Sequence, residues 1–217
     1  INGLLVSSRS KSNLTTTYAY DALERQTTVT DPRTGATTIA YYASGTGKKG
    51  QVYTVTDSAS NATTFDYDSS TGRRTSVTNA LGKTTTYAYN DRGQVTAVRG
   101  DASYPLDYAY DSYGRMTQLK TYRNEGLTNP DITTWAYDLP TGLLTSKTYA
   151  DSKAVSYTYD SANRLAKRRW ARGTNLDTDY GYSSTTGELI LINYSDSTPD
   201  VAFTYNRLGQ QKTVTDV

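Results

Sequence analysis

The chain has 217 residues, a formal net charge of +2, and neither histidine nor cysteine. Their absence excludes a Ser-His-Asp or Cys-His nucleophile, a histidine or cysteine zinc site and a disulfide framework. A charge this close to zero offers no steering towards nucleic acid or an acidic membrane surface. No segment reads as a transmembrane span or a signal peptide.

The chain begins in the middle of a repeated phrase. Gly3–Val6 reads as the second strand of a phrase whose first strand is missing, and Thr213–Val217 ends the chain in the same way. Between these ends, an aromatic-x-Tyr pair recurs at spacings of 21 to 27 residues. Such self-similarity indicates a repeat architecture. We therefore expect residues 1–217 to be a single array of about nine repeats, cut from a longer protein and without a second domain.

The second aromatic of every pair is tyrosine, whereas the first slot holds Tyr, Phe, Trp or Ile. Phenylalanine would bury as much surface, so the invariance predicts that each hydroxyl has a hydrogen-bond partner. Replacing Tyr110 by Phe is therefore expected to cost about 1 kcal/mol or more. The nine structural tyrosines are Tyr20, Tyr41, Tyr67, Tyr89, Tyr110, Tyr137, Tyr159, Tyr182 and Tyr205.

Each phrase predicts two strands and two turns. The first strand is a Thr-rich run into the aromatics, such as Thr84–Tyr89, and the second resembles Gln94–Val98. Asp or Asn followed by Gly supplies the turn between them. The expected turn glycines are Gly72, Gly93, Gly114, Gly142, Gly187 and Gly209. The predicted fold class is all-β, a repetitive antiparallel hairpin array that forms a long curved or spiralling sheet.

Two features of the repeats leave the geometry open. Apolar residues of the second strand are three apart, as Val95 and Val98 are, which places them on opposite faces of a regular strand. Either both faces are partly covered or a β-bulge restores the phase. Two longer repeats carry insertions around Gly45–Gly50 and Arg123–Pro130, which we expect to lie in turns.

The best-preserved phrase is Tyr-Ala-Tyr-Asp-Ser-Tyr-Gly-Arg at residues 108–115, and residues 157–164 repeat it as Tyr-Thr-Tyr-Asp-Ser-Ala-Asn-Arg. It resembles the tyrosine-aspartate (YD) repeat of the RHS family, which includes bacterial polymorphic toxins, insecticidal toxin complex components and teneurin ectodomains. The resemblance covers the whole chain and rests on nine copies.

The resemblance implies a section of a β-sheet that spirals into a hollow shell, which in the toxins encloses a C-terminal effector. Bacterial members usually end the shell with a core segment that contains Asp-Pro-x-Gly and a self-cleavage site. That segment is not found here, although Asp31–Gly35 is a similar turn, so cleavage and toxicity are not carried over. The implied partners are the remainder of the parent shell and its effector cargo, and the implied location is secreted or on the cell surface of a bacterium.

One basic cluster, Lys167–Arg172, stands out from the repeats. Read as a site, Arg168, Arg169 and Arg172 with Trp170 as a stacking ring would bind an anionic glycan or nucleic acid. Read as structure, it is a second strand whose charges alternate between faces. We favour the structural interpretation and do not expect nucleic acid as a partner.

Two classes of function follow from these patterns. The first is an encapsulating scaffold. The alternative is a cell-surface carbohydrate-binding or adhesion module that uses exposed Tyr and Trp. We favour the scaffold because the aromatics recur at one slot in every unit. Paired carboxylates such as Asp177 and Asp179 could serve a glycosidase, but turn roles are the simpler explanation, so we expect no enzyme, no cofactor and no metal. Open strand edges also predict self-association.

Overall fold

The computed structural model describes residues 3–124, 126–173 and 176–217. This part of the chain forms nineteen β-strands and no helix, so it contains no helix able to cross a membrane. The prediction of an all-β hairpin array is confirmed. Thr, Tyr and Val, which favour the pleated backbone, supply most of the strand residues.

The chain divides into two compact units, residues 1–107 with 122–128 and residues 108–121 with 129–217. The first unit contains β1 (Ser7–Arg9), β2 (Thr15–Tyr20), β3 (Gln26–Asp31), β4 (Gly35–Tyr41), β5 (Val52–Thr56), β6 (Ala62–Tyr67), β7 (Arg74–Thr78), β8 (Thr84–Tyr89), β9 (Val95–Arg99) and the start of β10 (Leu106–Tyr110). The second contains the end of β10, then β11 (Met116–Thr121), β12 (Asp131–Tyr137), β13 (Leu144–Thr148), β14 (Ala154–Tyr159), β15 (Leu165–Arg169), β16 (Asp177–Tyr182), β17 (Leu189–Tyr194), β18 (Val201–Tyr205) and β19 (Gln211–Asp216).

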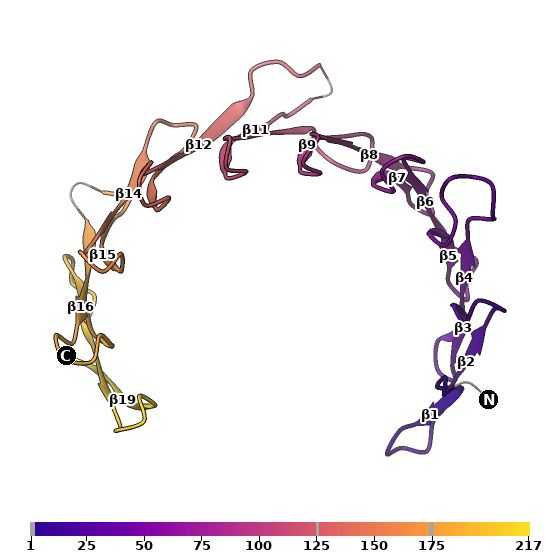
Figure 1. Ribbon diagram of the computed structural model, residues 1–217, viewed down its shortest axis with the longest axis horizontal. Helices are drawn as coiled ribbons and strands as arrows, with labels where there is room; N and C mark the ends of the chain where they lie inside the picture. Colours follow the sequence, from indigo (N-terminus) through magenta and orange to yellow (C-terminus); the bar gives the residue numbers. More distant parts are fainter. Residues whose placement is uncertain (1–2, 125, 174–175) are drawn as a thin grey trace. The chain divides into compact units, whose positions relative to one another are not determined.

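Consecutive strands pair antiparallel throughout each unit, from β1 with β2 to β8 with β9 and from β11 with β12 to β18 with β19. Within each unit the row of hairpins follows the chain order and bends (Figure 1). Within each unit the hairpins therefore contact their sequence neighbours, as in other repeat proteins.

A β-bulge places the apolar residues of the second strands on one face of the sheet. In the fourth repeat Tyr89 lies opposite Val95 and Tyr87 opposite Val98, so Thr96 is the extra residue and both valines share the face of the tyrosines. The same register shift occurs at Tyr20, Tyr41, Tyr67, Tyr89, Tyr137, Tyr159, Tyr182 and Tyr205. The bulge, rather than two covered faces, explains the three-residue spacing.

In seven of the nine repeats an aspartate or asparagine closes the turn that follows the tyrosine. In the fifth repeat Asp111 Oδ1 accepts the N–H groups of Tyr113 and Arg115, each at 2.9 Å, while Gly114 N–H donates to the Asp111 carbonyl at 3.0 Å. The six turn glycines all have φ between +70° and +85°, a backbone region that costs glycine little.

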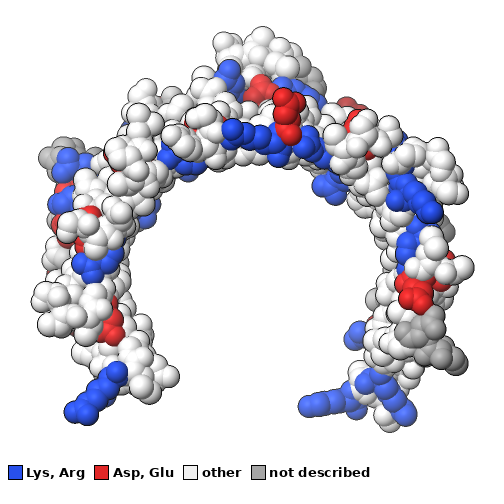
Figure 2. Space-filling model, viewed as in Figure 1, with Lys and Arg blue, Asp and Glu red and all other residues white. Residues whose placement is uncertain are grey.

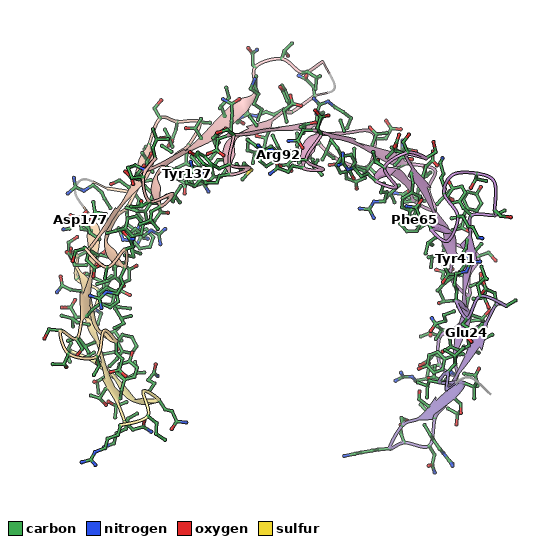
Figure 3. The ribbon with its side chains drawn as sticks, viewed as in Figure 1. Glu24, Tyr41, Phe65, Arg92, Tyr137 and Asp177 are labelled. Atoms are coloured by element: carbon green, nitrogen blue, oxygen red, sulfur yellow. The ribbon has the colours of Figure 1, made fainter. Side chains whose placement is uncertain are left out.

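Each unit is a single-layered sheet with two unlike faces. We call the side that carries both aromatics of each pair the aromatic face, and the side that carries the residue between them the opposite face. Among the described residues only Val98, Tyr122 and Val155 are buried hydrophobic side chains. The labelled Phe65 and Tyr137 point to the inner side of the bend of their own units (Figure 3). The aromatic face is therefore half-buried and has no layer packed over it.

On the side of each unit that Figure 2 shows, both acidic and basic groups are present among uncharged residues. This agrees with a net charge of +2. The two insertions lie between strands, one between β4 and β5 and the other between β11 and β12, as the sequence predicts.

Two glycines give a matched test of this backbone. A methyl group on Gly100 would lie 2.0 Å from the Thr84 carbonyl oxygen, whereas one on Gly82 would meet no atom within 4 Å; both residues have positive φ. We expect Gly82→Ala to lower the free energy of unfolding by about 1 to 2 kcal/mol through backbone strain alone. Gly100→Ala should cost clearly more, because β8 must shift. Urea denaturation of both variants checks this, and equal losses would contradict the close approach.

Candidate functional site

In seven repeats the hydroxyl of the second-slot tyrosine donates a hydrogen bond to the repeat before it. Tyr159 donates its hydroxyl to the Leu144 carbonyl at 2.8 Å, and Tyr182 donates to the Leu165 carbonyl at 2.9 Å. Leu144 lies opposite Tyr137, and Leu165 opposite Tyr159, at the register shift of the preceding hairpin. The acceptor is thus a residue of the bulge, where the regular ladder of the strand pair is interrupted.

This bond recurs along both units. Oxygen–oxygen distances are 2.7 to 2.9 Å for Tyr20, Tyr41, Tyr89, Tyr137, Tyr159, Tyr182 and Tyr205. Tyr67 instead contacts the ring of Tyr42 edge-on, with centroids 6.1 Å apart. Burial raises the pKa of Tyr110 and of Tyr159, as expected for a phenol held away from water.

The turn aspartate also holds an arginine. Asp160 Oδ2 accepts a hydrogen bond from Arg164 Nε at 2.8 Å, and the Arg164 guanidinium carbon lies 4.3 Å from the ring centroid of Tyr182 in the next repeat. The backbone amide and the guanidinium of Arg164 lower the pKa of Asp160. A guanidinium held by its own turn therefore rests on the aromatic ring of the following repeat.

The same arrangement of aspartate, arginine and tyrosine occurs at two other places. Its members are Asp21, Arg25 and Tyr41 in the first unit, and Asp111, Arg115 and Tyr137 in the second, with guanidinium-to-ring distances of 4.2 and 4.5 Å. The sequence motif includes this arginine, but the spacing alone assigns it no role. The signal was its position directly after the last turn residue, which is Glu24, Gly114 or Asn163.

The second repeat departs from the pattern in the place where its sequence does. Tyr42 stands where most copies have Asp, and its hydroxyl donates to the Phe65 carbonyl and to Asp66 Oδ1, each at 2.9 Å. Lys48, in the insertion, forms an ion pair with the same carboxylate. Burial, then the hydrogen bond to Asp66, raise the pKa of Tyr42 to about 12. The insertion is therefore anchored to the sheet.

The residues of the predicted ligand patch mostly contact other residues of the chain. Trp170 donates its indole N–H to Thr178 Oγ1 at 2.8 Å. The guanidinium carbons of Arg168 and Arg172 lie 3.8 and 5.0 Å from its ring centroid. Two cations therefore already occupy the ring that a sugar would stack on.

The remaining charges of the cluster are paired across β15 and β16. Arg169 binds both oxygens of Asp177, at 2.8 and 3.0 Å, and Lys167 lies 3.0 Å from Asp179. The carboxylate pair considered for a glycosidase thus consists of strand residues that neutralise lysine and arginine, rather than turn residues. Within the described ranges no group of three or more acidic side chains could hold a metal ion.

A family model described as RHS repeat matches residues 2–36, 69–105 and 137–174, slightly more than half of the chain. The chain belongs to the RHS repeat family. No curated protein matches the sequence.

Solved structures give the same fold. The crystal structure of TcdB2-TccC3 matches with a TM-score of 0.75 at 16% identity, over 99% of this chain and 12% of the other. TcdB2-TccC3 without its hypervariable C-terminal region gives 0.56 at 14% identity, over 99% and 15%. A Tc holotoxin pore of Photorhabdus luminescens that carries a TccC3 mutation gives 0.55 at 15% identity, over 99% and 13%. The chain therefore corresponds to about an eighth of the length of these proteins.

Removal of a single hydroxyl tests the tie between repeats. We expect Tyr159→Phe and Tyr182→Phe each to lower the free energy of unfolding by about 1 kcal/mol, because a carbonyl loses its donor. Tyr113→Phe is the matched control, since Tyr113 is 72% exposed at a turn. Urea denaturation measures all three, and a loss no greater than that of the control would contradict the role of the hydroxyl.

The Asp177 ion pairs predict a pH dependence. The hydrogen bond from Arg169 is the main cause that lowers the pKa of Asp177 from 3.8 to about 2. Because the folded-state pKa is depressed, the stabilisation is complete above 3.8 and is lost as the pH falls through about 2. Wild type should therefore be more stable than Asp177→Asn above this range, with the difference vanishing below it. A difference that does not change with pH would contradict the ion pair.

Proposed function

We propose that the chain is a section of an RHS-type shell wall that encloses or presents an effector polypeptide. The observation that carries this proposal is the tie between consecutive repeats, which extends a single-layered sheet without a second layer. In seven repeats the second-slot tyrosine supplies a hydroxyl donor to a carbonyl of the repeat before it. A wall can be lengthened by such units, whereas a catalytic centre is not built by repeating them.

The family membership and the fold likeness to TcdB2-TccC3 support the same proposal. By analogy with the toxins of this family, the partners would be the remaining repeats of the parent shell and the enclosed effector. We propose that the wall itself is not an enzyme and needs no cofactor, and that the whole protein is secreted or held at a cell surface.

Carbohydrate binding remains the second candidate, and it has weaker support. Its strongest residue, Trp170, contacts Arg168 and Arg172 through its ring and Thr178 through its N–H. A glycan array in which binding is selective and is abolished by Trp170→Ala would place this function first.

Protease protection in the full-length natural protein that contains this chain tests the scaffold. We expect one segment outside the repeats to resist protease in the wild type and to be digested when Tyr159→Phe and Tyr182→Phe are combined. Tyr113→Phe should leave the protection intact. If no segment is protected in the wild-type protein, or if its protection is independent of the tyrosines, the scaffold proposal is wrong.

A further inference from the structure

One position of the aromatic face changes its chemistry in two consecutive repeats. This position lies in the second strand, directly opposite the first-slot residue of the aromatic-x-Tyr pair. It is occupied by an aliphatic residue in six repeats, namely Val29, Val55, Val77, Val98, Ile192 and Val214. In the sixth and seventh repeats it is Lys147, opposite Trp135, and Arg168, opposite Tyr157.

Within the described part of the chain, these two cations have no carboxylate at ion-pair distance. Lys147 Nζ lies 5.4 Å from the ring centroid of Trp135 and 4.8 Å from that of Tyr149. Arg168 lies against Trp170, and its Nε is buried without a hydrogen-bond partner. The positive charges of Lys147 and Arg168 thus lie against aromatic rings, which do not neutralise them.

The opposite face of the same strands shows the contrast. There, Lys167 and Arg169 point away from the aromatic face, and both form ion pairs with Asp177, at 3.3 and 2.8 Å. In Figure 3 Asp177 lies on the outer side of the bend of its unit. On β13 and β15 the sheet therefore neutralises Lys167 and Arg169 on one face and leaves Lys147 and Arg168 without an ion pair on the other.

We propose that Lys147 and Arg168 form a docking site for an acidic, extended peptide segment. This inference rests on the proposed function, since the peptide would belong to the polypeptide that the wall encloses. We name Lys147, Arg168 and the rings of Trp135, Tyr149 and Trp170 the cationic aromatic patch.

The spacing of the two cations fits a peptide. They lie on β13 and β15, with β14 between them, where Val155 is opposite Lys147 and Tyr157 opposite Arg168. Two strand spacings and two residue rises place their Cα atoms about 12 Å apart. One phosphate group cannot span that distance, but two carboxylates three or four residues apart on an extended chain can. The neighbouring rings, which are half-buried, offer apolar contact beside them.

The surroundings disfavour a polyanion. A cavity of about 550 Å³ borders the patch at Tyr149, and its lining includes Asp131 and Asp151 together with Lys153 and Arg172. Two carboxylates and two cations balance in this lining, and Asp151 is ion-paired with Lys153 at 3.1 Å. The lining therefore adds no net positive charge for a continuous row of phosphates, whereas a peptide with two acidic residues needs only Lys147 and Arg168. A nucleic acid strand is therefore the competing outcome of the test.

Fluorescence anisotropy of a labelled peptide tests the site on the 217-residue chain. The probe is a peptide with Glu at two positions four residues apart and Leu between them, and the control peptide carries Gln instead of Glu. We expect the Glu peptide to bind at low salt. The double variant Lys147→Val with Arg168→Val should weaken binding roughly tenfold. It places valine where other repeats have it, so it should fold.

The matched control variant removes the same net charge elsewhere, as Lys11→Gln with Lys212→Gln, and should bind as the wild type does. Four results would overturn the site: no binding, equal binding of the Gln peptide, equal losses in both double variants, or tighter binding of a single-stranded oligonucleotide with the same sensitivity to Lys147 and Arg168. If the full-length protein protects a segment but the peptide does not bind, only the docking site fails. Binding without any protected segment leaves the site and refutes the scaffold.

Discussion

Seven second-slot tyrosines donate their hydroxyl to a carbonyl of the preceding repeat, and the sheet depends on this bond because it has no second layer to pack against. A single sheet exposes both faces, and here only Val98, Tyr122 and Val155 are buried hydrophobic side chains among the described residues. The buried apolar area must therefore come from many half-buried rings, each of which contributes a small part. Hydrogen bonds between neighbours then decide whether consecutive hairpins keep their register.

The turn, the bulge and the tyrosine depend on one another. The aspartate closes the turn and fixes the arginine, and the arginine covers the ring of the next tyrosine, as Asp160, Arg164 and Tyr182 do. The bulge brings the apolar residues of the second strand onto the aromatic face and provides the carbonyl that the next hydroxyl reaches. Each element thus connects two repeats, which is why the phrase recurs with its parts in a fixed order.

The period and the turn residues were enough to predict the strands, because β-propensity and Asp-x-x-Gly turns act within a few residues of the chain. The bulge at Tyr89 stayed open, since two packings give the same spacing of Val95 and Val98. The stacking of Arg164 on Tyr182 could not be predicted, because it joins residues of different repeats whose separation depends on the register. The pairing of Lys167 with Asp179 required the same knowledge of register, without which the basic cluster resembled a ligand patch.

Two-dimensional NMR of protein with labelled tyrosine rings tests the central interaction most directly, because a hydroxyl proton is seen only when hydrogen bonding slows its exchange with water. The account predicts persistent hydroxyl signals from Tyr41, Tyr137, Tyr159, Tyr182 and Tyr205, and none from the exposed Tyr104 and Tyr113. Fast exchange at the five repeat tyrosines, equal to that at the two exposed ones, would contradict it.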